Sequence, residues 1–568
     1  MIRIRKMLFR VPQKSLDLAL TSLFGLVAGL AAVAFLLTTN GIFKVCYLAW
    51  IEQPLGVFLG ISFVVIIGSS LLVGLLVTYL SREAVGSGVP QLKAAYWKEL
   101  GFVPWRAVWV RFLAGAASLG GGASLGREGP TVYVGGGLAS CLSGWLGTPK
   151  RQRRDAALVG AAAGLAAAFN TPLAAVTFVL EELLGDFGSR AMGKVVLGAV
   201  IGAFTVHALV GKQPAFSLPT VESHTWTLYV VVPLVATVAA LLGVIFQRAS
   251  LLWRERVRLR HRVPKWLWPV LGGLITWILG CSVFALTGHV GVFGLGYQDL
   301  SAALNNQVTW QVAGALVLAK LPATIACYST GGSGGIFSPT LFLGGLSGIF
   351  LAGVAGHWLP LGPDDYIILA VVGMSACFGA VVRAPLTAVL MVFEMTHQFA
   401  LIPALLLGTI ISQSLARLAG KHNFYDALLL QDGHELIHIK PPRDMTAWQN
   451  LPVSAVANFK PAIFREAGGV PLETFLDHHP YRCFPVEREG RLCGVVTRAA
   501  LEQMLRQRTP PPVEAAITCQ PEQTIREVAD RFLETPSGFM VVVDPASGTI
   551  RGVLTLHDLL RAQAALAE

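Results

Sequence analysis

Long apolar segments constrain this chain more strongly than any other feature of its sequence. An α-helix needs about 20 apolar residues to cross the hydrocarbon core of a bilayer. Segments that approach or exceed this length are Leu55–Leu80, Val195–Val210, Trp266–Leu286, Ile367–Val382 and Phe399–Leu415. The chain is 54% hydrophobic and only 14% charged, whereas a soluble domain carries about 25% charged residues. We therefore predict a polytopic membrane protein from about residue 18 to residue 418.

Basic residues gather in short segments between these apolar runs. They are Arg3, Arg5, Lys6 and Arg10 near the N-terminus and the clusters 150–154 and 254–262. Since loops rich in Lys and Arg tend to face the cytoplasm, we interpret the net charge of +11 as a topology signal and predict no nucleic-acid partner. The basic N-terminus resembles the start of a signal peptide. However, the apolar run Leu18–Leu37 has no convincing small-residue cleavage site and predicts a retained helix.

Three glycine turns share the spacing Gly-x-x-x-Pro, and each lies beside an apolar segment. They are GSGVP at Gly86–Pro90, GREGP at Gly126–Pro130 and GIFSP at Gly335–Pro339. Proline suits the first turn of a helix, glycine lets backbone amides approach a ligand, and the amides at a helix N-terminus attract anions. One of the turns also carries an acid at membrane depth, Glu128. We therefore predict that the three turns form one anion pathway.

The apolar region contains two halves that repeat one another. The stretch ALVGAAAGLAAAFNTPL from Ala157 aligns without a gap on AVVGMSACFGAVVRAPL from Ala370, an offset of 213 residues. The aligned pairs include Gly160/Gly373, Pro172/Pro385 and Glu181/Glu394. Apolar segments are interrupted at Gly86–Pro90, Asn170–Pro172, Gly331–Pro339 and Arg383–Pro385. Irregular backbone at membrane depth must be buried in protein or line a cavity, and helices broken in corresponding places of two repeats indicate a transport site.

The composition changes after about Leu418, where a tail with ordinary charge begins. Two stretches of this tail, Tyr481–Leu505 and Gly538–Gln563, each have the pattern strand, turn, strand, helix. This repeated pattern predicts a cytosolic regulatory module.

The cysteines are scattered along the chain, with no CxxC pair and no histidine at ligand spacing. The eight positions are Cys46, Cys141, Cys281, Cys327, Cys377, Cys483, Cys493 and Cys519. We predict neither a disulfide framework nor a zinc site, and no metal. Most of these cysteines are expected to be small buried apolar residues.

The three turns in this order, the run AAAGLAAAFNTPL and the internal repeat resemble the CLC family of chloride channels and chloride/proton antiporters, of the bacterial type, over about residues 16–430. The tail resembles a tandem pair of CBS domains. The resemblance implies an all-α polytopic membrane domain with broken helices over residues 1–430. We expect its repeat halves, about 16–215 and 225–430, to be inverted. It also implies a cytosolic α+β CBS pair over residues 431–568, with units at about 451–507 and 512–565.

The resemblance assigns the three turns as selectivity-filter motifs. Their residues are Gly86, Ser87, Gly88, Val89 and Pro90, then Gly126, Arg127, Glu128, Gly129 and Pro130, then Gly335, Ile336, Phe337, Ser338 and Pro339. Ser87 matches a serine whose hydroxyl coordinates the central anion, and Ile336 and Phe337 match residues whose backbone amides donate to it. Tyr425, in FYDALL, resembles the tyrosine that closes the inner end of the site.

Two acids carry over from the same resemblance. Glu128 matches the gating glutamate, whose carboxylate competes with anions and is protonated in turn. Glu182, the second acid after TFVL, matches the inner proton-transfer glutamate that antiporters have and true channels replace. Because one carboxylate serves both ions, exchange of anions for protons follows from this arrangement. Hydroxyls and amides supply partial positive charge without a fixed full charge, so a chloride ion can leave again.

Each of these residues also has a structural alternative. Glu128 can stabilise a helix N-terminus, Glu182 can be the solvated end of a helix, and Ser87 and Tyr425 can be ordinary loop hydroxyls. Lys320 lies in an apolar window and could attract the anion. We interpret it instead as a snorkelling or paired residue.

The tail contains one candidate nucleotide site. Thr555-x-x-Asp558 has the pattern whose acid holds a nucleotide ribose in some CBS pairs, whereas the first unit has Thr497 but Ala500 where the acid would be. At most one half-site is therefore suited to an adenine nucleotide, and no cofactor is required for transport. The alternative is a tail that stabilises a dimer and binds no ligand.

Three functions compete at this stage. The leading hypothesis is a chloride/proton exchanger, and its rival is a passive, voltage-gated type of chloride channel with the same fold. The third is a membrane enzyme or receptor with the CBS tail as a sensor, but no nucleophile–base pair, metal cluster or cofactor motif supports it, so we expect no enzyme. The family implies chloride, protons and the lipid bilayer as partners, a homodimer, and a plasma (inner) membrane location with both termini and the tail in the cytoplasm.

Overall fold

The computed structural model of the protein describes residues 13–188, 191–211, 216, 218–219, 226–260, 263–434, 447–465, 471–507, 509–533 and 538–565. The N-terminal basic residues Arg3, Arg5, Lys6 and Arg10 lie outside these ranges, as do residues 261–262 of the third basic cluster and the predicted limits of the two halves at residues 215 and 225. Residues 1–440 and residues 441–568 form two compact units.

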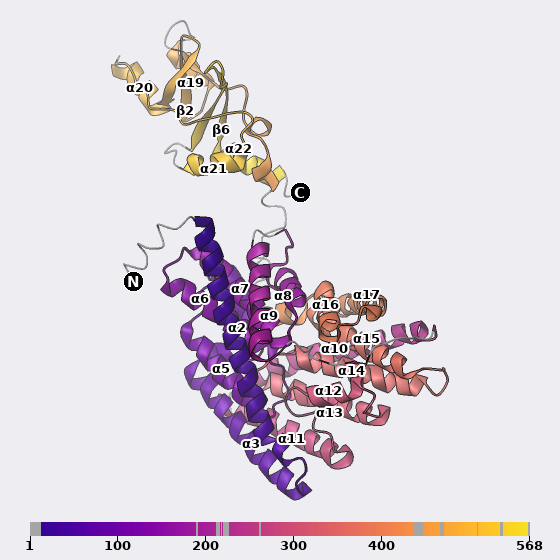
Figure 1. The fold of residues 1–568 in the computed structure, drawn as a ribbon. Helices are drawn as coiled ribbons and strands as arrows, with labels where there is room; N and C mark the ends of the chain where they lie inside the picture. The colour runs from indigo at the N-terminus through magenta and orange to yellow at the C-terminus, as the bar shows by residue number, and fades with distance from the viewer. Residues whose placement is uncertain are drawn as a thin grey trace. The chain divides into compact units, whose positions relative to one another are not determined.

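The first unit is helical and holds the predicted membrane segments (Figure 1). Within the described part of the chain, nine helical segments are long and apolar enough to cross a bilayer, as the sequence predicts. They are Ser15–Trp50, Leu55–Leu80, Met192–Leu209, Leu228–Leu259, Lys265–Thr287, Trp310–Ser329, Phe337–Ala355, Pro363–Val382 and Phe399–Gln431.

Two successive sets of helices follow the same order of long and short elements. The first set is α2 (Gln13–Cys46), α3 (Leu55–Leu75), α4 (Val89–Lys98), α5 (Trp105–Gly120), α6 (Glu128–Trp145), α7 (Lys150–Phe169), α8 (Pro172–Phe178, continued by a π-helical turn to Leu184) and α9 (Met192–Leu209). The second set is α10 (Leu228–Leu259), α11 (Trp268–Thr287), α12 (Tyr297–Leu304), α13 (Trp310–Ser329), α14 (Phe337–Ala355), α15 (Pro363–Val382), α16 (Pro385–Thr396) and α17 (Ile402–Ala419), and α18 (Phe424–Gln431) ends the unit. The order of elements therefore confirms the internal repeat.

The helices are broken where the sequence predicts. Helix α7 ends at Asn170 and α15 ends at Arg383, and these equivalent residues both adopt the left-handed conformation, with φ of 60° and 58°. The crossings of α6 with α7 and of α14 with α15 use equivalent glycine pairs, Gly135 with Gly160 and Gly344 with Gly373. In both crossings a side chain on either glycine would collide with the facing backbone carbonyl, which is how small residues bring helices together in membranes.

The two repeats cap each other's broken helices. The Glu394 carboxylate on α16 accepts the amide hydrogens of Leu173 and Ala174 at the start of α8, at 3.0 and 2.7 Å. Its equivalent Glu181 accepts those of Leu386 and Thr387 at the start of α16, at 3.1 and 2.8 Å. Carboxylates stabilise helix N-termini because the first amides have no partner within the helix.

This reciprocal capping fixes the relation between the halves. The end of α8 lies against the start of α16, and the end of α16 lies against the start of α8, so these equivalent helices are antiparallel neighbours. The two-fold rotation that superposes α8 on α16 and α16 on α8 has an axis perpendicular to both helices. For helices that cross a membrane, such an axis lies in the membrane plane, so the halves are inverted.

The second unit contains two three-stranded sheets with the same topology. In the first sheet, β1 (Phe464–Arg465) pairs in parallel with β2 (Cys483–Arg488), which pairs antiparallel with β3 (Arg491–Thr497). In the second, β4 (Thr518–Cys519), β5 (Phe539–Val543) and β6 (Ile550–Thr555) repeat this pattern. Helices of this unit are α19 (Leu472–His478), α20 (Arg498–Gln507), α21 (Ile525–Leu533) and α22 (Leu556–Ala565). The predicted pair of strand–turn–strand–helix units is therefore present.

The two tail units exchange short segments. Val453, which precedes the first tail sheet, packs in the core of the second tail sheet, with Ile525 and Val528. Val513, which precedes the second tail sheet, packs against the core of the first tail sheet. The predicted boundaries at 451–507 and 512–565 do not anticipate this exchange, because each segment adds to a core that is formed mainly by residues distant in sequence.

Replacing Glu394 with Gln leaves one acceptor oxygen where the carboxylate has two, so one buried amide of α8 loses its partner. We expect the free energy of unfolding to fall by about 1–3 kcal/mol, seen as a lower Tm of the purified protein in detergent. Glu181→Gln should act in the same direction because it caps the equivalent helix. Glu255→Gln, at an exposed glutamate on α10, is the matched control. A Glu394→Gln protein with the same Tm as this control would contradict the capping role.

Candidate functional site

The three glycine turns meet inside the first unit. Gly86 N–H donates to Gly332 O at 3.0 Å, and Gly334 N–H donates to Gly86 O at 3.2 Å. Gly126 and Gly335, at equivalent positions of the two repeats, exchange both backbone hydrogen bonds, at 2.7 and 2.5 Å. Helices α4, α6 and α14 begin at Val89, Glu128 and Phe337, so three helix N-termini start from these turns.

Glycine is required at two points of this junction. Gly88 precedes α4 with φ of 91°, a left-handed conformation that other residues adopt only with strain. A side chain on Gly126 would collide with Oε2 of Glu128. Glycine at position 126 therefore allows the backbone to lie close to the Glu128 carboxylate.

Two buried cations hold the backbone carbonyls of the neighbouring loops. Arg111 on α5 is fully buried and donates to Gly86 O at 2.8 Å and to Glu83 O, before α4. Lys320, at the equivalent position of α13, donates to the carbonyls of Gly291, Val292 and Gly294 at 2.9, 3.2 and 2.7 Å, before α12.

These contacts correct the interpretation of Lys320 made from the sequence. Its side chain is fully buried, so it does not snorkel, and it forms no ion pair with the described residues. Its three carbonyl partners instead satisfy the charge. The sequence could not indicate this because a carbonyl cage leaves no pattern of acidic residues.

The Glu128 side chain is buried at the first turn of α6 with no exposed surface. Its Oε1 accepts from the Ser338 hydroxyl at the start of α14 and from the Tyr297 hydroxyl of α12, the latter at 3.2 Å. Tyr297 and Ser338 also share a hydrogen bond of 2.7 Å. The carboxylate extends from the N-terminus of α6, in the first repeat, to the N-termini of α12 and α14, in the second.

The other predicted anion ligands surround the same junction. Ser87, Ile336, Phe337 and Tyr425 are all at most 1% exposed. The Ser87 and Tyr425 hydroxyls interact with one another, and both oxygens are buried. Because α14 begins at Phe337, the amides of Ile336 and Phe337 have no carbonyl within their own helix. The site thus offers hydroxyl and amide donors in a dry environment.

Glu182 lies in a separate cluster that the sequence did not predict. Its Oε1 accepts from Lys93 Nζ at 2.6 Å and its Oε2 from Asn423 Nδ2 at 2.7 Å. Lys93 also contacts Asp426 Oδ1 at 2.7 Å. Glu182 is 3% exposed, so the alternative of a solvated helix end is wrong. A lone lysine three residues after the GSGVP proline was the feature of the sequence that could have indicated this cluster.

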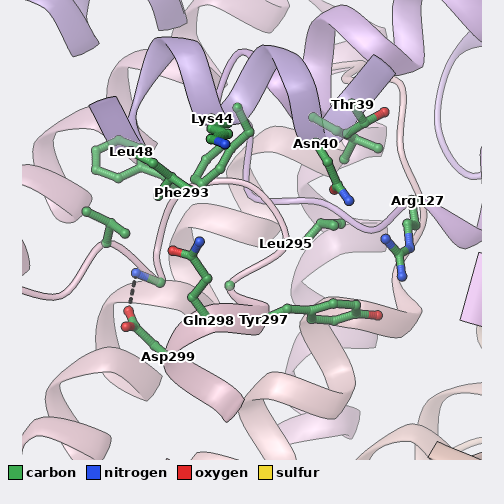
Figure 2. A pocket seen from close by; sticks show the side chains of 15 residues that line it. Thr39, Asn40, Lys44, Leu48, Arg127, Phe293, Leu295, Tyr297, Gln298 and Asp299 are labelled. Carbon is green, nitrogen blue, oxygen red and sulfur yellow. Dashed lines mark hydrogen bonds between the residues drawn. The ribbon is translucent and has the colours of Figure 1, made fainter. Parts of the chain in front are cut away.

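A pocket of about 310 Å³ lies on the other side of Glu128's hydrogen-bond partners. Arg127 and Tyr297 line it, with the Arg127 guanidinium 5.2 Å from the centre of the Tyr297 ring. Figure 2 shows Asn40 and Lys44 of α2 facing Tyr297 and Gln298 of α12 across this pocket. Tyr297 therefore contacts the buried carboxylate through its hydroxyl and also lines the pocket.

The tail unit contains a larger cavity, of about 570 Å³. It is lined by Tyr481, Arg482 and Cys483 at the start of β2, by Phe539 of β5 and Thr555 of β6, and by His557 and Asp558 of α22. Asp558 Oδ2 accepts from the Thr555 amide and hydroxyl at 3.0 and 2.6 Å, so the predicted pair caps α22. This cap leaves Oδ1 for another donor.

In the described part of the chain, no three His, Cys, Asp or Glu side chains are grouped so that they could hold a metal ion.

Comparison with known families gives two matches. The chain matches the voltage gated chloride channel family over residues 69–417 and the CBS domain over residues 508–565. The H(+)/Cl(-) exchange transporter ClcA of Cronobacter sakazakii is 31% identical over 440 residues, which cover 75% of this chain and 92% of the relative. The ClcA of Vibrio campbellii is 29% identical over 421 residues, 72% of this chain and 88% of the relative.

Solved structures show the same fold. A slow cyanobacterial Cl−/H+ antiporter matches with a TM-score of 0.65 and 24% identity, over 73% of this chain and 97% of that one. A CLC-type fluoride/proton antiporter matches with 0.61 and 21%, over 73% and 98%. A eukaryotic CLC transporter matches with 0.56 and 20%, over 95% of this chain and 97% of that one.

Proposed function

The chain belongs to the voltage gated chloride channel (CLC) family, and on this premise we propose that it is a secondary active transporter that exchanges chloride for protons. The family is one of membrane anion transporters and not of enzymes. In the proposal, Glu128 is the gate that both ions use, and Glu182 delivers protons to it.

The observation that carries this proposal is the position of Glu128. Its carboxylate is fully buried and accepts hydrogen bonds from Ser338 and Tyr297 at the junction of two helix N-termini. Partial positive charge at such a junction attracts any anion. A carboxylate that lies there therefore competes directly with chloride, and a proton on that carboxylate removes the competition.

The surrounding donors suit a chloride ion that must also leave. The Ser87 and Tyr425 hydroxyls and the amides of Ile336 and Phe337 provide partial charges only, and weak binding at several sites is what conduction requires. We propose chloride rather than fluoride as the substrate because the filter motif contains Ser87 and because two relatives are named as H(+)/Cl(-) exchangers.

Glu182 supports exchange over a passive channel. It is an acid buried at 3% exposure, and it interacts with Tyr425, which in turn interacts with Glu128. Tyr425 thus lies within electrostatic reach of both acids. A passive channel has no need of a second buried acid, since only the anion moves. The homodimer, the plasma membrane location and a cytoplasmic tail, all implied by the family, are part of this proposal.

Replacing Glu128 with Ala should abolish proton movement and leave chloride flux. The reason is that the competing carboxylate is lost while the hydroxyl and amide donors remain. The measurement is flux from proteoliposomes, in which wild-type protein under a chloride gradient should drive protons against their own gradient. Glu255→Gln, at the exposed glutamate of α10, should behave as wild type.

Two results would contradict the assignment. Chloride flux without proton movement in the wild-type protein would establish the passive channel instead. Proton coupling that survives in Glu128→Ala would show that protons move without this acid.

We also propose that the tail cavity binds an adenine nucleotide. Its volume of about 570 Å³ is within the roughly 300–1,000 Å³ range of small-molecule sites. Asp558 Oδ1 can accept from ribose hydroxyls, Arg482 can contact phosphate, and Tyr481 offers a ring for the base, and all three line the cavity. The alternative, a tail without ligand, is an outcome of the following test.

Asp558→Asn should weaken AMP or ATP binding to the full-length protein by about tenfold, equivalent to roughly 1.4 kcal/mol, because a carboxylate accepts from two ribose hydroxyls better than an amide. Isothermal titration calorimetry measures this affinity. Glu522→Gln, an exposed position outside the cavity, is the control. No binding to the wild-type protein at millimolar nucleotide would contradict the proposal.

A further inference from the structure

The cluster around Glu182 joins three helices with one cation and two acids. Lys93 comes from α4, the helix that begins in the GSGVP turn, and Asp426 comes from α18, which also carries Tyr425. Lys93 Nζ lies 2.6 Å from Glu182 Oε1 and 2.7 Å from Asp426 Oδ1. The lysine thus bridges the two carboxylates.

Asn423 fixes the geometry of this cluster. It is the N-cap of α18, where its Oδ1 accepts the Asp426 amide hydrogen at 2.7 Å. Its Nδ2 donates to Glu182 Oε2 at 2.7 Å. Asn423 therefore orients the Glu182 carboxylate and caps the helical turn that carries Asp426, and rotation of either acid would break a hydrogen bond.

The three members differ in their access to water. The Lys93 side chain is fully buried, and the Glu182 side chain is 3% exposed. The Asp426 side chain is 21% exposed, so it is the member of the cluster that is open to solvent. A proton that enters from water therefore meets Asp426 first.

The charge of the cluster determines whether it can take up a proton. With both acids ionised, one ammonium and two carboxylates sum to −1, and one added proton brings this sum to zero. Burial favours a neutral cluster over a charged one. If only Lys93 and Glu182 were present, the pair would already be neutral, and a proton would create an uncompensated buried cation.

Two other charged groups nearby, Arg383 and Glu181, form their hydrogen bonds outside this cluster. Arg383 interacts electrostatically with Asp426, but its guanidinium donates to the carbonyls of Gly420 and Ala416 at 2.8 and 2.6 Å. Arg417 lies beside Arg383. Glu181, next to Glu182 in sequence, points away and caps α16.

We propose that Asp426 is a proton-transfer residue, which receives protons from water and passes them through Lys93 to Glu182. The inference rests on the proposed exchange function. In the balanced step, a hydronium ion protonates Asp426 and leaves water. Lys93 Nζ gives one proton to Glu182 Oε1 and regains one from the Asp426 acid. The Lys93 ammonium is restored and Glu182 is protonated. Only N–H and O–H bonds break and form, so no group is oxidised or reduced.

The test measures the ratio of proton to chloride flux in proteoliposomes of the full-length protein. Asp426→Asn should lower this ratio by at least about tenfold while chloride flux continues, because Lys93 and Glu182 are then a closed neutral pair. Asp426→Glu should keep most of the wild-type ratio, because a carboxylate that can take up the proton and pass it to Lys93 is retained. Asp432→Asn is the matched control, since Asp432 follows the opposite end of α18 and pairs with Arg254 and Arg258.

The outcomes separate this inference from the proposed function. A wild-type protein that moves no protons would contradict the exchange function itself. A coupled wild type with an equally coupled Asp426→Asn variant would overturn the role of Asp426. A loss of coupling in Asp426→Asn that is equally large in Asp426→Glu would also overturn it, because a carboxylate at this position would then not be what proton transfer needs. If Asp426→Asn yields no chloride flux, the Asp426→Glu variant decides, since chloride flux without proton movement in that variant would overturn the role.

Discussion

The structure depends on how the ends of its broken helices are satisfied within the membrane, where no water is available for backbone groups. Side chains from within the fold take on this role. Arg111 and Lys320, equivalent residues of α5 and α13, donate hydrogen bonds to the loop carbonyls. Glu181 and Glu394 accept the first amides of α16 and α8. Once these groups are paired, the amides that remain at the filter turns are available to an anion or to Glu128.

The inverted repeat explains why the functional site is asymmetric in chemistry although symmetric in backbone. Glu128 begins α6 and Phe337 begins α14, and these residues follow the paired glycines Gly126 and Gly335. One repeat therefore brings a titratable acid to the junction, and the other brings only amides and the Ser338 hydroxyl. Binding an anion requires the two helix N-termini. Coupling anion movement to proton movement requires the acid as well, so the proposed exchange depends on the residue in which the two halves differ.

The sequence predicted the membrane helices, their four breaks, the repeat and the two tail units, because each of these depends on local periodicity or on proline and glycine. It also predicted the convergence of Ser87, Glu128, Ile336, Phe337 and Tyr425 through resemblance to a family. It did not predict the carbonyl partners of Arg111 and Lys320, since carbonyls carry no sequence pattern. Nor did it predict the bridge from Lys93 to Asp426, because these residues lie on helices far apart in the chain.

The central claim is that a halide binds at the junction of the α6 and α14 N-termini and that Glu128 competes for this position. The most direct measurement is anomalous diffraction from crystals of the Glu128→Gln protein grown in bromide. The account predicts one bromide peak within hydrogen-bonding distance of the Ser87 and Tyr425 hydroxyls and a second where the Glu128 carboxylate lies beside Ser338. Maps at high bromide with neither peak, or with the side chain at position 128 turned away from the junction toward lipid, would contradict it.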